Sequence, residues 1–214
     1  MPPSKLGKAI LGETSDSSER TRKSDQTRQE ILEAALEFLW THPFRDLSVR
    51  ELMSNTESSR SAFYQYFADL YELSETLLRG LELDIFQAAT PWFHGEGAPE
   101  PLLEESLGGL VQICYERGPI LRAVSDAAVS DERLEQQWNA FLSKFDDAVE
   151  QKIAQHQSQE LIPQFDPRPI AIALNRMDAS LLIEAFGRRP RQNPEPVLAA
   201  LIRIWRATLY DADK

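Results

Sequence analysis

The chain has 214 residues, 42% of them apolar, and a formal net charge of −11. This length allows one large domain or a small domain followed by a larger one, and the apolar fraction excludes a globally disordered chain. No run of about 18 apolar residues occurs and the start lacks an apolar signal segment, so we expect neither a membrane partner nor secretion. Cys114 is the only cysteine, which excludes an internal disulfide and predicts a cytoplasmic protein.

The negative charge is unevenly distributed. Residues 20–79 carry eight Lys or Arg and ten Asp or Glu, whereas residues 80–214 carry most of the acidic excess. No segment has the basic footprint typical of a nucleic-acid binder, so charge alone argues mildly against that class of protein.

The N-terminal quarter of the chain predicts a flexible arm and then three short helices. Residues 1–24 are polar without an apolar period, which predicts the arm. A first helix follows, which ends near His42-Pro43 because proline interrupts helical hydrogen bonding. Its apolar positions have helical spacing: Ile31, Leu32, Ala35, Leu36 and Leu39.

Polar residues placed before apolar runs predict the starts of the next helices. Ser48 and Glu51 form a capping-box pattern for a helix from Val49 to about Asn55. After the polar stretch 56–58, Ser59 can cap a helix over residues 60–66, and Asp69 can cap a fourth.

The rest of the chain is also predicted to be helical. Thr90-Pro91 is expected to end the fourth helix, and residues 95–101 to form a loop. Further apolar stripes have helical spacing, with Pro-rich breaks at residues 163–169 and 190–196. No β-alternation of useful length occurs, so we predict an all-α fold of about nine helices.

The segment from Ser48 to Phe67 has the pattern of a helix-turn-helix, whose second helix places its first residues against base edges in the major groove. Small residues there allow close approach, Arg60 can reach a guanine edge or a phosphate, and Tyr64 offers a phenolic donor to phosphate. The residues predicted to contact double-stranded operator DNA are Ser48, Ser59, Arg60, Ser61, Ala62, Tyr64, Gln65 and Tyr66.

The stretch Ser59–Phe67, read SRSAFYQYF, resembles the S-R-x-T-F-Y-x-Y-F signature of the TetR (tetracycline-repressor-like) family, and residues 47–52 resemble that family's preceding helix. The resemblance implies a transcriptional regulator, usually a repressor, that binds DNA as a homodimer. It places a helix-turn-helix domain at residues 25–69 and a ligand-binding and dimerisation domain at 70–214.

Two features depart from the family pattern: Glu57 and Ser58 replace Gly and an apolar residue in the turn, and Leu70 replaces a phosphate-binding Lys. If the backbone at Glu57 is left-handed, this residue costs about 1 kcal/mol relative to Gly.

The stretches 138–142, 173–178 and 201–210 resemble the ethionamide-resistance repressor subgroup of the same family. That resemblance implies a long apolar tunnel for a small apolar ligand that releases the DNA. The wall residues that it implies are Leu107, Leu110, Cys114, Trp138, Phe141, Leu142, Phe145, Asn175, Asp178, Phe186 and Trp205. Asn175 and Asp178 lie at i and i+3, on one helix face, and either a ligand or neighbouring groups such as Trp205 could satisfy them.

Other classes of protein receive less support. His42, His94 and His156 form no metal-binding pair, and GxSxG and Gly-rich phosphate loops do not occur, so we expect neither an enzyme nor a cofactor. The serious alternative is a helical ligand-binding or scaffolding dimer whose helix-turn-helix no longer binds DNA, a reading that Glu57, Leu70 and the acidic balance favour.

Overall fold

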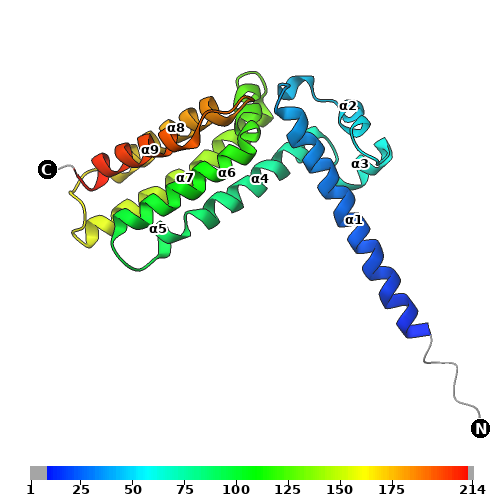
Figure 1. The fold of residues 1–214 in the computed structure, drawn as a ribbon, viewed down its shortest axis with the longest axis horizontal. Helices are drawn as coiled ribbons and strands as arrows, with labels where there is room; N and C mark the ends of the chain where they lie inside the picture. The colour runs from blue at the N-terminus through cyan, green and yellow to red at the C-terminus, as the bar shows by residue number, and fades with distance from the viewer. Residues whose placement is uncertain (1–8, 212–214) are drawn as a thin grey trace, which may run out of the picture.

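The computed structural model describes residues 9–211, which fold into an N-terminal head and a larger helical body (Figure 1). All regular elements in this range are helical, which confirms the predicted all-α class, and nine of them are α-helices. The head contains α1 (Ala9–Leu39), the 3-10 helix η1 (Phe44–Asp46), α2 (Val49–Ser54) and α3 (Arg60–Tyr66). The body contains α4 (Leu70–Ala88), α5 (Thr90–His94), α6 (Pro99–Ala128), α7 (Glu132–Ser158), α8 (Pro167–Phe186) and α9 (Pro194–Leu209).

The predicted helix caps form in the head. The Ser48 hydroxyl accepts a hydrogen bond from the Glu51 backbone N–H at 3.1 Å, and the Ser59 hydroxyl accepts one from Ala62 N–H at 3.3 Å. Asp69 caps α4 in the same way, by accepting from Glu72 N–H at 2.9 Å. These acceptors satisfy backbone donors that the first turn of a helix otherwise leaves unpaired.

The N-terminal arm requires a correction. Residues 9–24 form the first turns of α1, which projects away from the rest of the chain in Figure 1, instead of an irregular segment. No proline interrupts the chain between residues 9 and 39, so the helix that is anchored at Ile31 and Ala35 continues backwards into polar sequence. Residues 1–8 of the expected arm lie outside the described residues.

Two boundaries in the body also differ from prediction. The α4 helix ends at Ala88, and Thr90-Pro91 begins the short helix α5. Proline suits the first turn of a helix because the N–H that it lacks has no partner there. For the same reason Pro99 opens α6, and the loop expected at residues 95–101 is shorter.

Helix α6 is the centre of the body and packs against α4, α5, α7, α8 and α9. Pro119 lies inside it and cannot donate to the carbonyl of Tyr115, four residues earlier. The Arg191 guanidinium donates to that carbonyl at 2.7 Å and lies 3.8 Å from the Tyr115 ring centroid. A side chain that follows α8 therefore compensates the interruption in α6.

The head is held on the body by arginines around the C-terminal end of α1. The Arg122 guanidinium, from α6, is 5% exposed and donates to the carbonyl oxygens of Leu39 and His42, the latter at 3.0 Å. Arg189 forms two hydrogen bonds to Glu37, at 2.6 and 3.1 Å, and lies over the buried Trp40 ring. These contacts fix the helix end from which the chain enters the helix-turn-helix.

Two glycines of α6 provide a matched test of the close packing of α6 on α8. A Cβ at Gly118 would lie 2.5 Å from the carbonyl oxygen of Phe186, whereas a Cβ at Gly108 would meet nothing within 4 Å. We predict that Gly118→Ala lowers the free energy of unfolding by about 1–3 kcal/mol, because the two backbones must separate. Gly108→Ala should raise it by up to about 1 kcal/mol, because alanine favours helix. Urea unfolding of both variants measures the difference, and equal effects at the two positions would contradict the packing described.

Candidate DNA-binding surface and ligand cavity

The residues predicted to contact DNA lie on the outer face of the helix-turn-helix. Six of them are exposed in the structure: Ser48, Ser59, Arg60, Ser61, Tyr64 and Gln65. Tyr64 is 53% exposed, which places the ring on the surface and not in the core. The other two, Ala62 and Tyr66, are half-buried.

Two aromatic residues hold this face in place from below. Phe63 and Phe67 are 0% and 1% exposed, and their ring centroids lie 5.5 Å apart. They are one turn apart, so burying both turns Arg60 and Tyr64 towards solvent. The helical period of this nine-residue motif thus explains which side chains are free to meet a partner.

The turn between α2 and α3 is not strained at Glu57. Glu160 is the only non-glycine residue in the described chain with a positive φ, so the left-handed conformation considered for Glu57 does not occur. The Thr56 hydroxyl donates to the Met53 carbonyl at 3.1 Å and accepts from Ser58 N–H at 3.3 Å. These hydrogen bonds pair backbone groups of the turn, which therefore forms without a glycine.

The structure adds a basic residue that the sequence pattern did not single out. The exposed Arg28 of α1 has its guanidinium carbon 5.6 Å from the Phe67 ring centroid, beside the end of α3. Only the packing of α1 on α3 reveals this proximity, because the two residues are far apart in sequence. Leu70, at the position of the family's lysine, is half-buried and lines the junction of head and body.

The body encloses a small apolar cavity of about 70 Å³ between α4, α6, α7 and α8. Seven of the eleven expected wall residues line it: Leu110, Cys114, Phe141, Leu142, Phe145, Asn175 and Asp178. The structure adds Ile85, Leu121, Ala179 and Leu182, which the resemblance did not name. This volume is well below the roughly 300–1,000 Å³ of typical ligand pockets, so the cavity is much smaller than the long tunnel that we expected.

The four remaining residues do not line the cavity. Leu107 is buried in the core, and Trp138 stacks on Phe141 with ring centroids 5.6 Å apart. Phe186 packs edge-on against Tyr115 at 5.5 Å. The Trp205 indole N–H donates a hydrogen bond to Asp178, which itself lines the cavity. The resemblance implied all four as wall residues, but packing between helices decides which side chains meet a cavity.

Asp178 is a carboxyl group buried in apolar surroundings. The Trp205 indole N–H donates to both of its oxygens, at 3.0 and 3.1 Å. Burial raises the pKa of Asp178 to about 7, although the Trp205 hydrogen bond opposes this rise. Burial, with a smaller contribution from Asp178, also raises the pKa of Cys114 to about 12, so this thiol stays protonated and unreactive.

Asn175 has a different partner from Asp178. Its amide donates to Asp146 of α7 at 3.0 Å, and the Arg176 guanidinium bonds to both oxygens of the same carboxylate, at 3.1 and 2.8 Å. The two polar residues of the predicted pair therefore both have protein partners, as the alternative reading allowed, although within the described part of the chain Asp178 has only one donor for its two oxygens.

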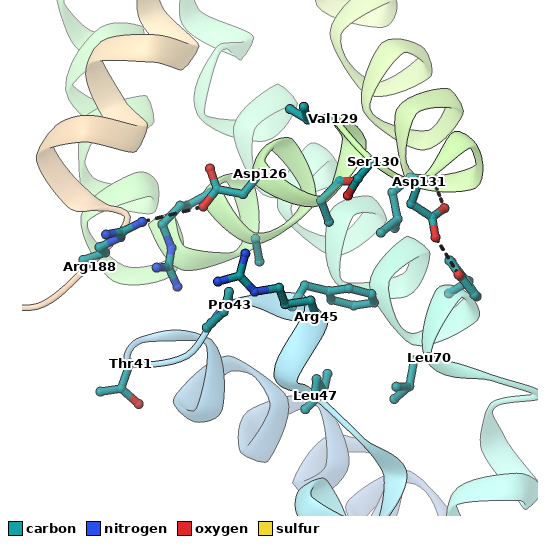
Figure 2. Close-up of a pocket in the computed structure, with 16 residues that line it drawn as sticks. Thr41, Pro43, Arg45, Leu47, Leu70, Asp126, Val129, Ser130, Asp131 and Arg188 are labelled. Atoms are coloured by element: carbon teal, nitrogen blue, oxygen red, sulfur yellow. Dashed lines mark hydrogen bonds and ion pairs between the residues drawn. The ribbon is translucent and has the colours of Figure 1, made fainter.

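A larger cleft of about 780 Å³ lies between head and body, next to Arg122 (Figure 2). Residues 41–47 of the head form one wall, and residues 122–134, where α6 turns into α7, form the other. Arg188 pairs with Asp126 at 3.7 Å on one side of it, and Asp131 accepts from the Tyr71 hydroxyl at 2.6 Å on the other. The junction of head and body therefore lies beside open space.

A helix-turn-helix head on a larger helical body is an architecture typical of DNA-binding transcriptional regulators. The family model "Bacterial regulatory proteins, tetR family" matches residues 31–75, and "Transcriptional regulator EthR, C-terminal domain" matches residues 103–211. The chain belongs to the TetR family of transcriptional regulators, within its EthR-like group.

Individual relatives agree with this assignment. The HTH-type transcriptional regulator EthR of Mycobacterium tuberculosis is 23% identical over 194 residues, which cover 89% of this chain and 90% of that protein. NalD of Pseudomonas aeruginosa, the secondary repressor of the MexAB-OprM multidrug efflux pump, superposes with a TM-score of 0.69 at 22% identity, covering 88% of this chain and 98% of its own. A structure described as a TetR-family regulator from Syntrophomonas wolfei gives a TM-score of 0.71 at 16% identity, covering 86% and 95%.

The raised pKa of Asp178 predicts a pH dependence of stability. Between its ordinary value of 3.8 and about 7, the folded chain binds more protons at this carboxyl than the unfolded chain does. The contribution of Asp178 to stability therefore falls as pH rises through this window and stays low above pH 7. The uncharged variant Asp178→Asn keeps an acceptor for Trp205, so above pH 7 it should be more stable than the wild type by an amount on the order of a few kcal/mol.

Urea unfolding of both proteins between pH 5 and pH 8 measures this difference, which should shrink as the pH falls. The buried His156, whose pKa burial lowers to about 4, destabilises both proteins in acid and cancels in the comparison. Parallel pH profiles for the two proteins would contradict the account of Asp178.

Proposed function

We propose that this protein is a cytoplasmic repressor that binds operator DNA as a homodimer and releases it when a small apolar molecule occupies the cavity in the body. The exposed face of α3, held outward by the buried Phe63 and Phe67, is the observation that carries the proposal. It presents Ser59, Arg60 and Tyr64 in the arrangement that a recognition helix needs at base edges and phosphates.

A dimer suits this arrangement because paired recognition helices must reach successive major grooves, about 34 Å apart. Helices α8 and α9 supply a candidate surface: Ile204 is 40% exposed, and Met177, Leu181 and Ile202 are only half-buried. Apolar side chains left at the surface of adjacent helices favour association with a second copy.

Ligand control requires that the cavity and the head be mechanically connected. Helix α6 makes this connection, because Leu110 and Cys114 line the cavity and Arg122, further along the same helix, holds the end of α1. A molecule that enlarges the cavity displaces α6 and with it the Arg122 contacts. The cleft beside Arg122 gives the head room to move, so that the two heads no longer match successive grooves.

A second candidate function is a ligand-binding or scaffolding dimer whose head no longer binds DNA. Leu70 favours it, because this residue offers no charge to a phosphate. A gel-shift assay with DNA from around the protein's own gene separates the two. A complex that survives competition by random DNA supports the regulator, whereas no complex at low salt supports the scaffold.

Tyr64 provides a specific prediction. Tyr64 is exposed and its hydroxyl is expected to donate to phosphate, so Tyr64→Phe should weaken binding about tenfold or more, because a hydrogen bond to a charged group contributes about 1.5–3 kcal/mol. The loss should be similar on operator and random DNA, because phosphate contacts carry no sequence information. Fluorescence anisotropy measures both affinities, with Tyr115→Phe in the body as a control that leaves them unchanged. A loss confined to the operator would contradict this role.

A further inference from the structure

Asp178 is a buried carboxyl group without a cation. It is 6% exposed, and among the described residues its side chain bonds only to the Trp205 indole. No Lys, Arg or His is among the residues that line the cavity, and Cys114 is the only other titratable one. Arg176, two residues earlier in the sequence, donates two hydrogen bonds to Asp146 and none to Asp178.

This environment leaves the carboxylate poorly compensated. A single indole donor shared between two oxygens leaves most of their acceptor capacity unused. A buried carboxylate is normally paired with a cation or is neutralised by a proton. Below about pH 7 a proton fulfils this role, because burial raises the pKa of Asp178 to about 7.

Aromatic rings also line the cavity. Phe141 and Phe145 both line it, with ring centroids 5.0 Å apart in an edge-to-face arrangement, and Phe86 stacks on Phe145 at 4.6 Å. An ammonium group is attracted to the face of an aromatic ring, and this attraction strengthens when water is excluded. A buried carboxylate and aromatic rings that line one cavity are a combination that recognises an organic cation.

The cavity also limits the shape of its occupant. Its volume of about 70 Å³ has room for a small polar head but not for a whole ligand. Leu110, Phe145 and Ala179 line it and are only half-buried, so parts of the lining reach the surface and leave a way out for an apolar tail.

We propose that the cavity selects protonated amines with an apolar tail, whose ammonium group pairs with the Asp178 carboxylate in the cavity that Phe141 and Phe145 also line. This proposal rests on the proposed ligand-controlled function and names the chemical class of its ligand. Pairing replaces the proton on Asp178 by the ammonium group, so binding below pH 7 releases that proton to the buffer. The amine itself stays protonated, and no covalent bond forms.

The test compares n-hexylamine with n-hexanol and hexanoate, which share its alkyl tail. Isothermal titration of the full chain without DNA should show n-hexylamine binding about 10- to 100-fold more tightly than n-hexanol at pH 8, the range of a charge-assisted hydrogen bond. Hexanoate should bind least. At pH 6 the enthalpy of n-hexylamine binding should depend on the ionisation enthalpy of the buffer, whereas that of n-hexanol should not.

Asp178→Asn supplies the matched variant. It should remove both the preference for n-hexylamine and the proton release while n-hexanol binds as before. Equal affinity of the wild-type chain for amine and alcohol at pH 8, or amine binding without proton release at pH 6, would overturn the proposal, and neither result requires the variant to fold.

Operator release is measured separately. An amine that binds through Asp178 but leaves the DNA complex intact would support the ligand class and contradict the proposed induction. Release by amine and alcohol at equal affinity would overturn the ligand class and leave the induction standing.

Discussion

The carbonyl groups at the C-terminal end of α1 depend on donors from the body, and Arg122 supplies them. A helix ends with carbonyls that have no partner within the helix, and a guanidinium at that end also offsets the negative end of the helix dipole. Because Arg122 is buried, this contact cannot be exchanged for water without cost. The position of the helix-turn-helix on the body follows from it, since the chain enters α2 only a few residues after His42.

The same helix that carries Arg122 organises the body. Pro119 breaks the hydrogen-bond ladder of α6 one turn earlier, and Arg191 donates to the carbonyl that this break leaves free. Gly118 allows the backbone of α8 to approach closely at the same level. Leu110, Cys114 and Leu121 of α6 line the cavity, so it extends along this packed region as far as the residue next to Arg122.

Local sequence signals predicted much of the fold. Caps at Ser48, Ser59 and Asp69 and the spacing of Phe63 and Phe67 depend on neighbouring residues, and the structure has the helices that they imply. Contacts between distant segments could not be predicted in this way. Nothing near Arg122 in sequence points to Leu39, and helical spacing could not separate Leu110, which lines the cavity, from Leu107, which does not. Asp178 illustrates both points. Its position on the same face of α8 as Asn175 was predictable from the sequence, but the absence of a cation among the described residues beside it depends on which residues α4, α6 and α7 place around the cavity.

The most direct test of this account is the affinity of the Arg122→Gln variant for DNA from around the protein's own gene. It is measured by fluorescence anisotropy at a temperature where circular dichroism shows the variant to be folded. Arg206→Gln makes the same change at the far end of the body, where Arg206 pairs with Glu104 at 3.0 Å. If Arg122 fixes the head for DNA binding, Arg122→Gln weakens the complex about tenfold or more, the effect of losing about 1.4 kcal/mol, and Arg206→Gln changes it less than about twofold. A folded Arg122→Gln variant that binds this DNA as tightly as the wild type would contradict the account.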